Sequence, residues 1–220
     1  MNSDRGLVIF DLDGTLFCSD TATIPAVQQC FAEFGLRAPA VEDIREYIGP
    51  SEDEFHDWLR SLCPPALASP VVDAVVRREH QMVSQTGHLY SGVYQALATL
   101  HAHVDQMAIC TYGRPHYAEE VLSNHGLAPF FDLVRCYTTP LDSKRDMVRD
   151  LLDRSQCRPA IVIGDRGVDI EAAHDNGLRA IGVLYGYGSA EELAMADAVA
   201  STPPQLPDLV QRLLRDGIPD

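Results

Sequence analysis

The stretch LVIFDLDGTLF, residues Leu7–Phe17, joins a short apolar run to two closely spaced aspartates. Four apolar residues lead straight into Asp11 and Asp13, and Gly14 follows. Residues two apart on an extended segment face the same way, so the two carboxylates share one small volume. Because like charges repel and burial of either one costs free energy, such a pair is typical of a solvated loop, a cation site or a catalytic site.

The two aspartates suit a division of labour between a base and an acid. An ionised Asp11 is a nucleophile or a metal ligand, whereas Asp13 can hold a proton because adjacent carboxylates push their pKa values apart. Gly14 permits a tight turn that brings the backbone close to a ligand. We therefore expect Asp11, Asp13 and Gly14 to lie in an active site, and an acidic loop that caps the next helix is the alternative.

Short apolar runs predict a sheet, and segments with helical periodicity alternate with its strands after residue 107. The expected strands are Leu7–Phe10, Met107–Cys110, Leu133–Cys136, Ala160–Ile163, Ala180–Val183 and Ala198–Ala200. The helices expected between and after the later strands are His116–His125, Ser143–Leu152, Val168–Asn176, Ala190–Ala196 and Leu206–Arg215. Continuous apolar strands that alternate with helices indicate an α/β fold with a doubly wound, Rossmann-like parallel sheet covered on both faces.

The region from residue 19 to residue 87 contains no strand candidate. Its expected helices are Thr23–Phe34, Val41–Tyr47, Ser51–Leu62 and Val71–Ser84, separated by prolines. Ser51 followed by Glu54 fits a capping box at the start of one of them. The sequence thus predicts a core of residues 1–18 and 88–220 and an all-helical cap of residues 19–87, with hinges near 17–20 and 86–92 that let the cap open and close.

Two more aspartates follow a later strand in the stretch GDRGVD, residues 164–169. Asp165 at the strand tip is placed to coordinate a hard cation through oxygen. Asp169 either joins that site or stabilises the first turn of the next helix, where an acidic residue is favourable by about 0.3–1 kcal/mol. Sites of doubly wound folds lie outside the carboxyl ends of the strands. We therefore expect the three polar clusters that follow strands, marked by Asp11, Thr111 and Asp165, to share one crevice.

Thr111 and Lys144 complete the set of candidate catalytic residues. Thr111 follows a buried strand, and its hydroxyl can donate to a phosphate oxygen or bond to its own turn. Lys144 begins a predicted helix, where it either neutralises phosphate charge or is an ordinary exposed lysine.

Composition narrows the classes of partner. The formal charge of −15 argues against a nucleic-acid partner, and no apolar run approaches the length of a membrane helix. Six cysteines without a CxxC pair favour reduced thiols, and the histidines show no ligand spacing. With no signal-peptide pattern at residues 1–5, we expect a cytosolic protein. Its expected oligomeric state is a monomer or a homodimer. A small anionic substrate remains compatible with this charge, because a bound cation reverses the local sign.

Taken together and in order, four motifs resemble the haloacid dehalogenase superfamily. They are Asp11-Leu12-Asp13-Gly14-Thr15-Leu16, Thr111, Lys144 and Gly164-Asp165-Arg166-Gly167-Val168-Asp169. The segment GVLYGYGSAEELAMADAVASTPPQL, residues 182–206, and the helical insert look like the phosphoglycolate phosphatase branch of that superfamily. The resemblance covers nearly the whole chain.

The resemblance implies a mechanism and a metal. Asp11 attacks phosphorus and forms an aspartyl-phosphate, while Asp13 protonates the leaving alcohol and then activates water. Thr111 and Lys144 stabilise the phosphoryl oxygens. The implied ligands of Mg²⁺ are Asp11, the backbone carbonyl of Asp13, and Asp165, with Asp169 in support. The second aspartate favours phosphoryl transfer over dehalogenation, so the implied activity is hydrolysis of a small phosphorylated metabolite.

Several neighbours depart from the usual pattern of related phosphatases. Cys18-Ser19 replaces Asp-Ser, and Tyr112 stands where asparagine is common. Tyr112, Gly113 and Arg114 are candidate substrate contacts, although Arg114 fits an exposed position before a helix equally well. Two alternative functions remain. One is a phosphomutase of the β-phosphoglucomutase type, disfavoured by the acidic stretch Gly49–Glu54, and the other is a non-catalytic binding or regulatory protein of this fold.

Overall fold

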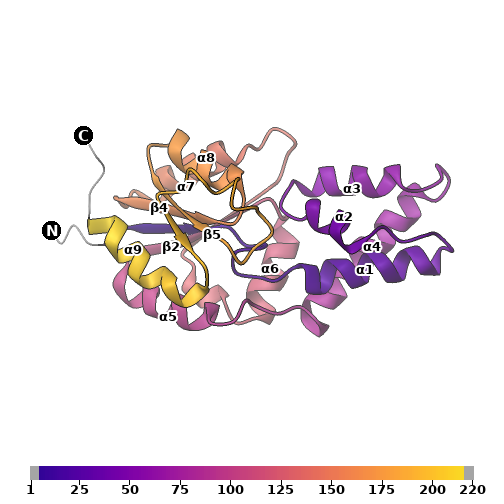
Figure 1. Cartoon of the computed structure of the whole chain (residues 1–220), viewed down its shortest axis with the longest axis horizontal. Coiled ribbons are helices and arrows are strands. Elements are labelled where there is room, and N and C mark those ends of the chain that lie inside the picture. The colour runs from indigo at the N-terminus through magenta and orange to yellow at the C-terminus, as the bar shows by residue number, and fades with distance from the viewer. Residues whose placement is uncertain (1–4, 216–220) are drawn as a thin grey trace.

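The computed structural model describes residues 5–215 and is built on a six-stranded parallel sheet (Figure 1). The strands are β1 (Leu7–Phe10), β2 (Gln106–Thr111), β3 (Leu133–Cys136), β4 (Ala160–Gly164), β5 (Arg179–Val183) and β6 (Ala198–Ala200). Their order across the sheet is β3-β2-β1-β4-β5-β6, and every neighbouring pair is parallel. The predicted doubly wound α/β class is confirmed.

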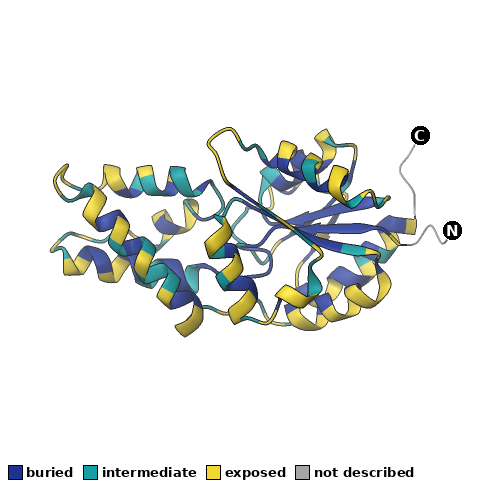
Figure 2. Cartoon of the chain, turned by 180° about the vertical axis from the view of Figure 1, so that it is seen from behind, coloured by how far each residue is buried: buried dark blue, intermediate teal, exposed yellow. Residues whose placement is uncertain are grey.

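Both faces of the sheet are buried. One face is covered by α5 (Val93–His103), α6 (Pro115–Asn124) and α9 (Leu206–Arg215), and the other by α7 (Lys144–Ser155) and α8 (Gly167–Asp175). Within β1, Val8 and Phe10 belong to the first core, whereas Leu7 and Ile9 belong to the second. Figure 2 shows the strands as a buried layer between helices whose outer sides are exposed. Burial on both sides explains why these strands are continuous apolar runs in the sequence.

The order of strands reverses at β1, which lies at the centre of the sheet. Such a reversal opens a crevice at the carboxyl ends of the strands. Asp11 follows β1 directly, and its N–H donates to the carbonyl of Ile163 at 2.8 Å. Thr111 is the last residue of β2, and Asp165 follows the end of β4. The three polar clusters therefore meet at one edge, as the sequence predicted.

Four helices follow β1 and pack against one another beyond that edge (Figure 1). They are α1 (Asp20–Glu33), α2 (Val41–Glu46), α3 (Glu52–Ser61) and α4 (Ala68–Gln85), and we call them the helical unit. They enclose their own apolar cluster, which includes Phe31, Leu59 and Val75. At the start of α3, the N–H of Glu54 donates to Oγ of Ser51 at 3.4 Å, in agreement with the predicted cap.

Two connections between the helical unit and the sheet run side by side. The N–H of Cys18 donates to the carbonyl of His88 at 2.9 Å, and the N–H of Tyr90 donates to the carbonyl of Leu16 at 3.1 Å. These are the segments in which the sequence predicted hinges. Hinge motion itself stays a prediction.

The predicted helix Ala190–Ala196 is wrong, because this segment is a series of turns. A helical start does form, since the N–H of Glu192 donates to Oγ of Ser189 at 3.1 Å. The helix cannot continue, because Asp197 anchors the following chain to β5 by accepting the N–H of Ala180 at 2.8 Å. β6 begins at the next residue, so the segment is too short to repay the cost of helix nucleation.

The remaining elements are two short 3₁₀ segments, Ala128–Phe130 and Pro203–Gln205. All six cysteines are free thiols, as their spacing predicted. Within residues 5–215, no helix combines the length and the hydrophobicity needed to cross a membrane.

Candidate active site

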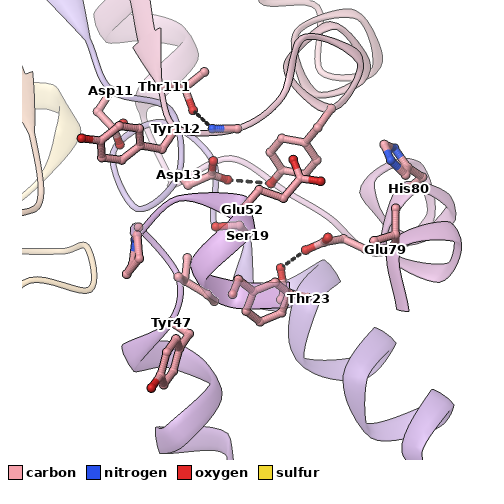
Figure 3. Close-up of a pocket in the computed structure, with 17 residues that line it drawn as sticks. Asp11, Asp13, Ser19, Thr23, Tyr47, Glu52, Glu79, His80, Thr111 and Tyr112 are labelled. Atoms are coloured by element: carbon pink, nitrogen blue, oxygen red, sulfur yellow. Dashed lines mark hydrogen bonds between the residues drawn. The ribbon is translucent and has the colours of Figure 1, made fainter. Parts of the chain in front are cut away.

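A cavity lies between the carboxyl edge of the sheet and the helical unit (Figure 3). On the sheet side it is lined by Asp11, Asp13, Thr111, Tyr112 and Gly113. The opposite side is formed by α1, α3, α4 and the loop before α3. Residues predicted from separate motifs, Asp11 and Thr111, thus border one cavity.

Lys144 is the only lysine of the chain, and it is buried beside Asp11. Its ammonium lies 2.5 Å from Oδ1 of Asp11 and 2.9 Å from Oδ1 of Asp169. Burial by itself lowers the pKa of Lys144, but the two carboxylates outweigh burial and raise the pKa well above its usual value. Lys144 therefore stays cationic, and the alternative of an exposed lysine at a helix start is excluded.

Asp11, Asp165 and Asp169 form a buried acidic cluster, with one carboxylate oxygen of each within 4.8 Å of the others. The hydroxyl of Thr15 lies 3.3 Å from both Oδ2 of Asp11 and Oδ1 of Asp165. Burial, followed by repulsion from Asp169, raises the pKa of Asp165 to about 7. Burial also raises the pKa of Asp11, against the opposing effect of Lys144. Three buried carboxylates outnumber one ammonium, which is the environment that a hard divalent cation neutralises.

Asp169 fulfils the capping role that the sequence left open. Its Oδ2 accepts the N–H of Arg166 at 3.2 Å at the start of α8. Its Oδ1 faces the ammonium of Lys144. One carboxylate thus holds both the first turn of α8 and the lysine that contacts Asp11.

Asp13 accepts a hydrogen bond from the hydroxyl of Tyr117, with 2.6 Å between the oxygens. Burial raises the pKa of Asp13, and the bond from Tyr117 partly offsets this rise. The sequence predicted that repulsion between Asp11 and Asp13 would separate their pKa values. In the structure, burial is the main cause for Asp13, and the carboxylates that repel Asp11 are Asp169 and Asp165. A raised pKa suits a proton donor.

Thr111 and Tyr112 border the cavity beside Lys144. The hydroxyl of Thr111 accepts the N–H of Gly113 at 2.9 Å, so the local turn forms, and the hydroxyl keeps its own proton to donate. The hydroxyl of Tyr112 accepts the N–H of Lys144 at 2.9 Å, and its ring centroid lies 5.1 Å from Nζ. Tyr112 therefore positions the lysine as well as lining the cavity.

The absence of a side chain at Gly14 lets the carboxylate of Asp165 lie close to the backbone. The φ of Gly14 is +80°, and a Cβ at this position would lie 2.2 Å from Oδ2 of Asp165. The same oxygen accepts the N–H of Tyr187 at 2.8 Å. A side chain at Gly14 would displace Asp165 from the acidic cluster.

Arg114 lies outside the cavity lining and joins the sheet region to α3. Its Nη2 lies 2.7 Å from Oδ1 of Asp53, and its Nε lies 3.6 Å from Oε2 of Glu52. The hydroxyl of Tyr137 donates to Oδ2 of Asp53 at 2.8 Å. The guanidinium is thus occupied by carboxylates of the chain itself.

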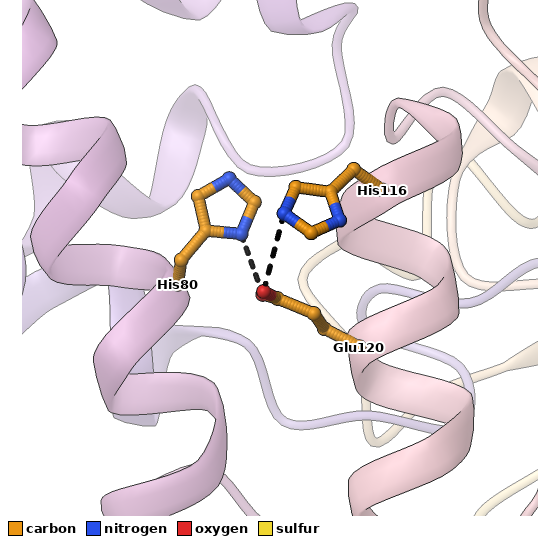
Figure 4. Close-up of side chains that lie close together, drawn as sticks. All are labelled: His80, His116 and Glu120. Atoms are coloured by element: carbon orange, nitrogen blue, oxygen red, sulfur yellow. Dashed lines mark hydrogen bonds and ion pairs between the residues drawn. The ribbon is translucent and has the colours of Figure 1, made fainter.

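A second group of possible metal ligands connects α4 to α6 (Figure 4). Nδ1 of His80 lies 2.5 Å from Oε2 of Glu120, and Nε2 of His116 lies 3.4 Å from Oε1 of the same carboxylate. The spacing of the histidines did not predict this group, because His80 lies on α4 and the other two residues lie on α6, far along the chain. His116 is largely exposed, and the group links the helical unit to the sheet region.

Comparison with known proteins agrees with this geometry. The model of the haloacid dehalogenase-like hydrolase family matches residues 8–183, and the chain belongs to that family. A phosphoglycolate phosphatase of Vibrio cholerae is 30% identical over 204 residues, which is 87% of this chain and 89% of the relative. One of Synechococcus elongatus is 31% identical, covering 94% of this chain and 98% of its own length. Within the family, the chain is a phosphatase.

Solved structures share the fold. A haloacid dehalogenase-like hydrolase from Streptococcus pneumoniae superimposes with a TM-score of 0.81 at 23% identity, covering 94% of this chain and 99% of the other. The superfamily that the sequence motifs resemble is confirmed by the match of the family model, and the shared fold agrees with it.

Sequence reasoning missed several residues of the site. Tyr117 contacts Asp13 from a helix whose pattern carries no indication of it. Thr15 belongs to the first motif, but its place between two carboxylates depends on β4. Lys144, by contrast, was predicted from the sequence, and it is the one lysine among the 17 basic residues.

Proposed function

We propose that this chain is a Mg²⁺-dependent phosphomonoesterase that hydrolyses a small phosphorylated metabolite through a phosphorylated Asp11. The contact between Asp11 and Lys144 inside a buried acidic cluster carries this proposal. A fixed ammonium beside a carboxylate nucleophile offsets the charge of an incoming phosphoryl group. The relatives named phosphoglycolate phosphatases support the reaction class.

In the first step, Asp11 attacks phosphorus, and the bond from phosphorus to the ester oxygen breaks. Asp13 donates its proton to that oxygen, and the alcohol leaves. Tyr117 orients Asp13 for this transfer through its hydrogen bond. The hydroxyl of Thr111 and the ammonium of Lys144 stabilise the phosphoryl oxygens.

In the second step, the ionised Asp13 accepts a proton from water as the water oxygen attacks phosphorus. The bond between phosphorus and Asp11 breaks, and inorganic phosphate leaves. Asp11 returns to its contact with Lys144, and Asp13 is again protonated. The same carboxyl group thus serves as acid and then as base.

Asp11, the backbone carbonyl of Asp13, and Asp165 would hold Mg²⁺, with Asp169 in support. The excess of buried negative charge over the single ammonium fits a divalent cation with oxygen ligands. When bound, the ion would offset negative charge on the phosphoryl group.

The helical unit is proposed to act as a cap of residues 19–87 on a core of residues 1–18 and 88–220, of which 1–4 and 216–220 lie outside the described residues. Contacts that would hold the cap closed include Arg114 with Asp53, and Arg166 with the carbonyl of Ile48 at 3.2 Å. A cytosolic location and a monomeric or homodimeric state stay predictions.

Release of inorganic phosphate from p-nitrophenyl phosphate tests the proposal. We expect hydrolysis with Mg²⁺, its loss with EDTA, and a decrease on the order of a thousandfold or more in Asp11→Asn. Asp73→Asn, an exposed aspartate of α4, is the matched control. Hydrolysis that survives EDTA or Asp11→Asn contradicts the proposal, as does isomerisation of a sugar phosphate without release of phosphate.

A further inference from the structure

The part of the cavity beyond Asp13 is acidic. We propose that this part selects the leaving alcohol by charge: it admits phosphomonoesters whose alcohol is neutral or carries an ammonium group, and discriminates against those that carry a second anion such as a carboxylate. This inference rests on the proposed function and deepens it by naming the class of substrate.

The charged side chains around the cavity are predominantly carboxyl groups. Among the described residues that line it, four carry carboxyl groups, namely Asp11, Asp13, Glu52 and Glu79, and none is a lysine or an arginine. The only imidazole in the lining belongs to His80. A substrate with a second anion would therefore meet carboxyl groups without a guanidinium or ammonium partner.

The end of the cavity that would hold the phosphoryl group is separate from the end left for the alcohol. Lys144 lies behind Asp11 at the sheet edge, where the phosphoryl group would bind. Glu79 lies on α4 on the far side of the cavity, and Thr23 of α1 donates to its Oε1 (Figure 3). The cation of the site therefore serves the phosphoryl group, and the carboxyl group of Glu79 faces the space left for the alcohol.

Two arginines that contact residues of the cavity lining are already engaged. Arg114 bonds to Asp53 and lies 3.6 Å from Oε2 of Glu52. Arg166 bonds to the carbonyl of Ile48 and to Glu192. Recruiting either one for a substrate carboxylate would break these contacts.

The electrostatics of Glu79 agree with this geometry. Burial, opposed by the hydroxyl of Thr23, raises the pKa of Glu79 to about 7, and the carboxylates of Asp13 and Glu52 add to the rise. An ammonium group in the cavity would relieve this repulsion, and a second carboxylate would increase it.

Three phosphomonoesters of similar size test the proposal: phosphoglycolate with a carboxylate, 2-hydroxyethyl phosphate with a hydroxyl, and 2-aminoethyl phosphate with an ammonium. For each we would measure kcat/KM for phosphate release with Mg²⁺, or competition with p-nitrophenyl phosphate where turnover is slow. The expected order is ammonium at or above hydroxyl, with the carboxylate ester about tenfold or more below the hydroxyl ester.

The three alcohols differ as leaving groups, so absolute rates are not directly comparable. The decisive quantity is the ratio of kcat/KM for the ammonium ester to kcat/KM for the carboxylate ester, compared between the wild type and a variant. Glu79→Gln removes the charge and keeps an oxygen that can accept the bond from Thr23. We expect the preference for the ammonium ester over the carboxylate ester to fall about tenfold in this variant. Glu42→Gln, an exposed residue of α2, is the control and should keep the wild-type ratio.

The outcomes separate this inference from the proposed function. Charge selection is overturned if the wild type prefers the carboxylate ester and Glu79→Gln leaves the ratio of kcat/KM between the ammonium and carboxylate esters unchanged. The proposed phosphatase activity would still stand in that case. If no ester, including p-nitrophenyl phosphate, releases phosphate with Mg²⁺, the proposed function fails and this inference fails with it.

Discussion

The ammonium of Lys144 lies 2.5 Å from Oδ1 of Asp11, and both groups are buried. A buried ion pair adds little net stability, because desolvation of the two charges offsets their attraction. Lys144 also contacts Asp169, so a single cation is shared by two of the three carboxylates in the cluster. Its position is better explained by the charge that a phosphoryl group brings to Asp11 than by stability alone.

Replacing Lys144 by methionine should destabilise the protein by about 3–5 kcal/mol, because the variant leaves buried carboxylates without their cation. The loss should be smaller at pH 5 than at pH 8. Burial already raises the pKa of Asp11 and Asp165, and without the ammonium these groups take up protons more readily at the lower pH. Urea unfolding without divalent cations at the two pH values measures the effect. Arg145→Met, at the exposed neighbour, is the control, and an equal loss at both pH values would contradict the explanation.

Glu79 should make the protein less stable as pH rises from about 4.5 to about 7. Its folded pKa is raised to about 7 from an ordinary value of 4.5, so the unfolded chain releases the proton first across this window. Glu79→Gln removes the penalty and should stabilise the protein by about 2 kcal/mol at pH 8 and by little at pH 4, after allowance for solvent in the cavity. Chemical unfolding across this range tests the sign. Glu119→Gln, at an exposed position of α6, is the control. An equal pH-dependent stabilisation of this variant would show that the effect does not belong to Glu79.

The contact between Arg114 and Asp53 should favour the closed arrangement of the helical unit. An exposed ion pair contributes about 0.2–1 kcal/mol, so Arg114→Gln should raise KM by a factor of about 1.5–5 with a smaller change in kcat. Asp53→Asn should act in the same way, and the double variant should be no worse than the stronger single one. A double-mutant cycle at low and high salt measures the coupling. Fully additive effects would indicate that the pair does not hold the unit closed.

Features that depend on short segments could be predicted from the sequence. The strands, their parallel orientation and the convergence of Asp11, Thr111 and Asp165 follow from buried apolar runs that end in polar residues. Contacts between segments far apart in the chain could not be predicted, as Tyr117 with Asp13 and Arg114 with Asp53 illustrate. The helix predicted from Ala190 to Ala196 was wrong for a related reason. The composition of the segment favours a helix, but the bond between Asp197 and β5 anchors the chain that follows it and prevents one.

The central claim is that Asp11 becomes phosphorylated during turnover. The most direct measurement is acid quenching of the wild-type protein with Mg²⁺ and p-nitrophenyl phosphate within the first turnovers, followed by mass spectrometry of the peptide that contains Asp11. We expect the added mass of one phosphoryl group on Asp11, its decay as substrate is exhausted, and its absence in Asp11→Asn. Steady hydrolysis with Asp11 unmodified at every quench time, or hydrolysis by Asp11→Asn at the wild-type rate, would contradict the account.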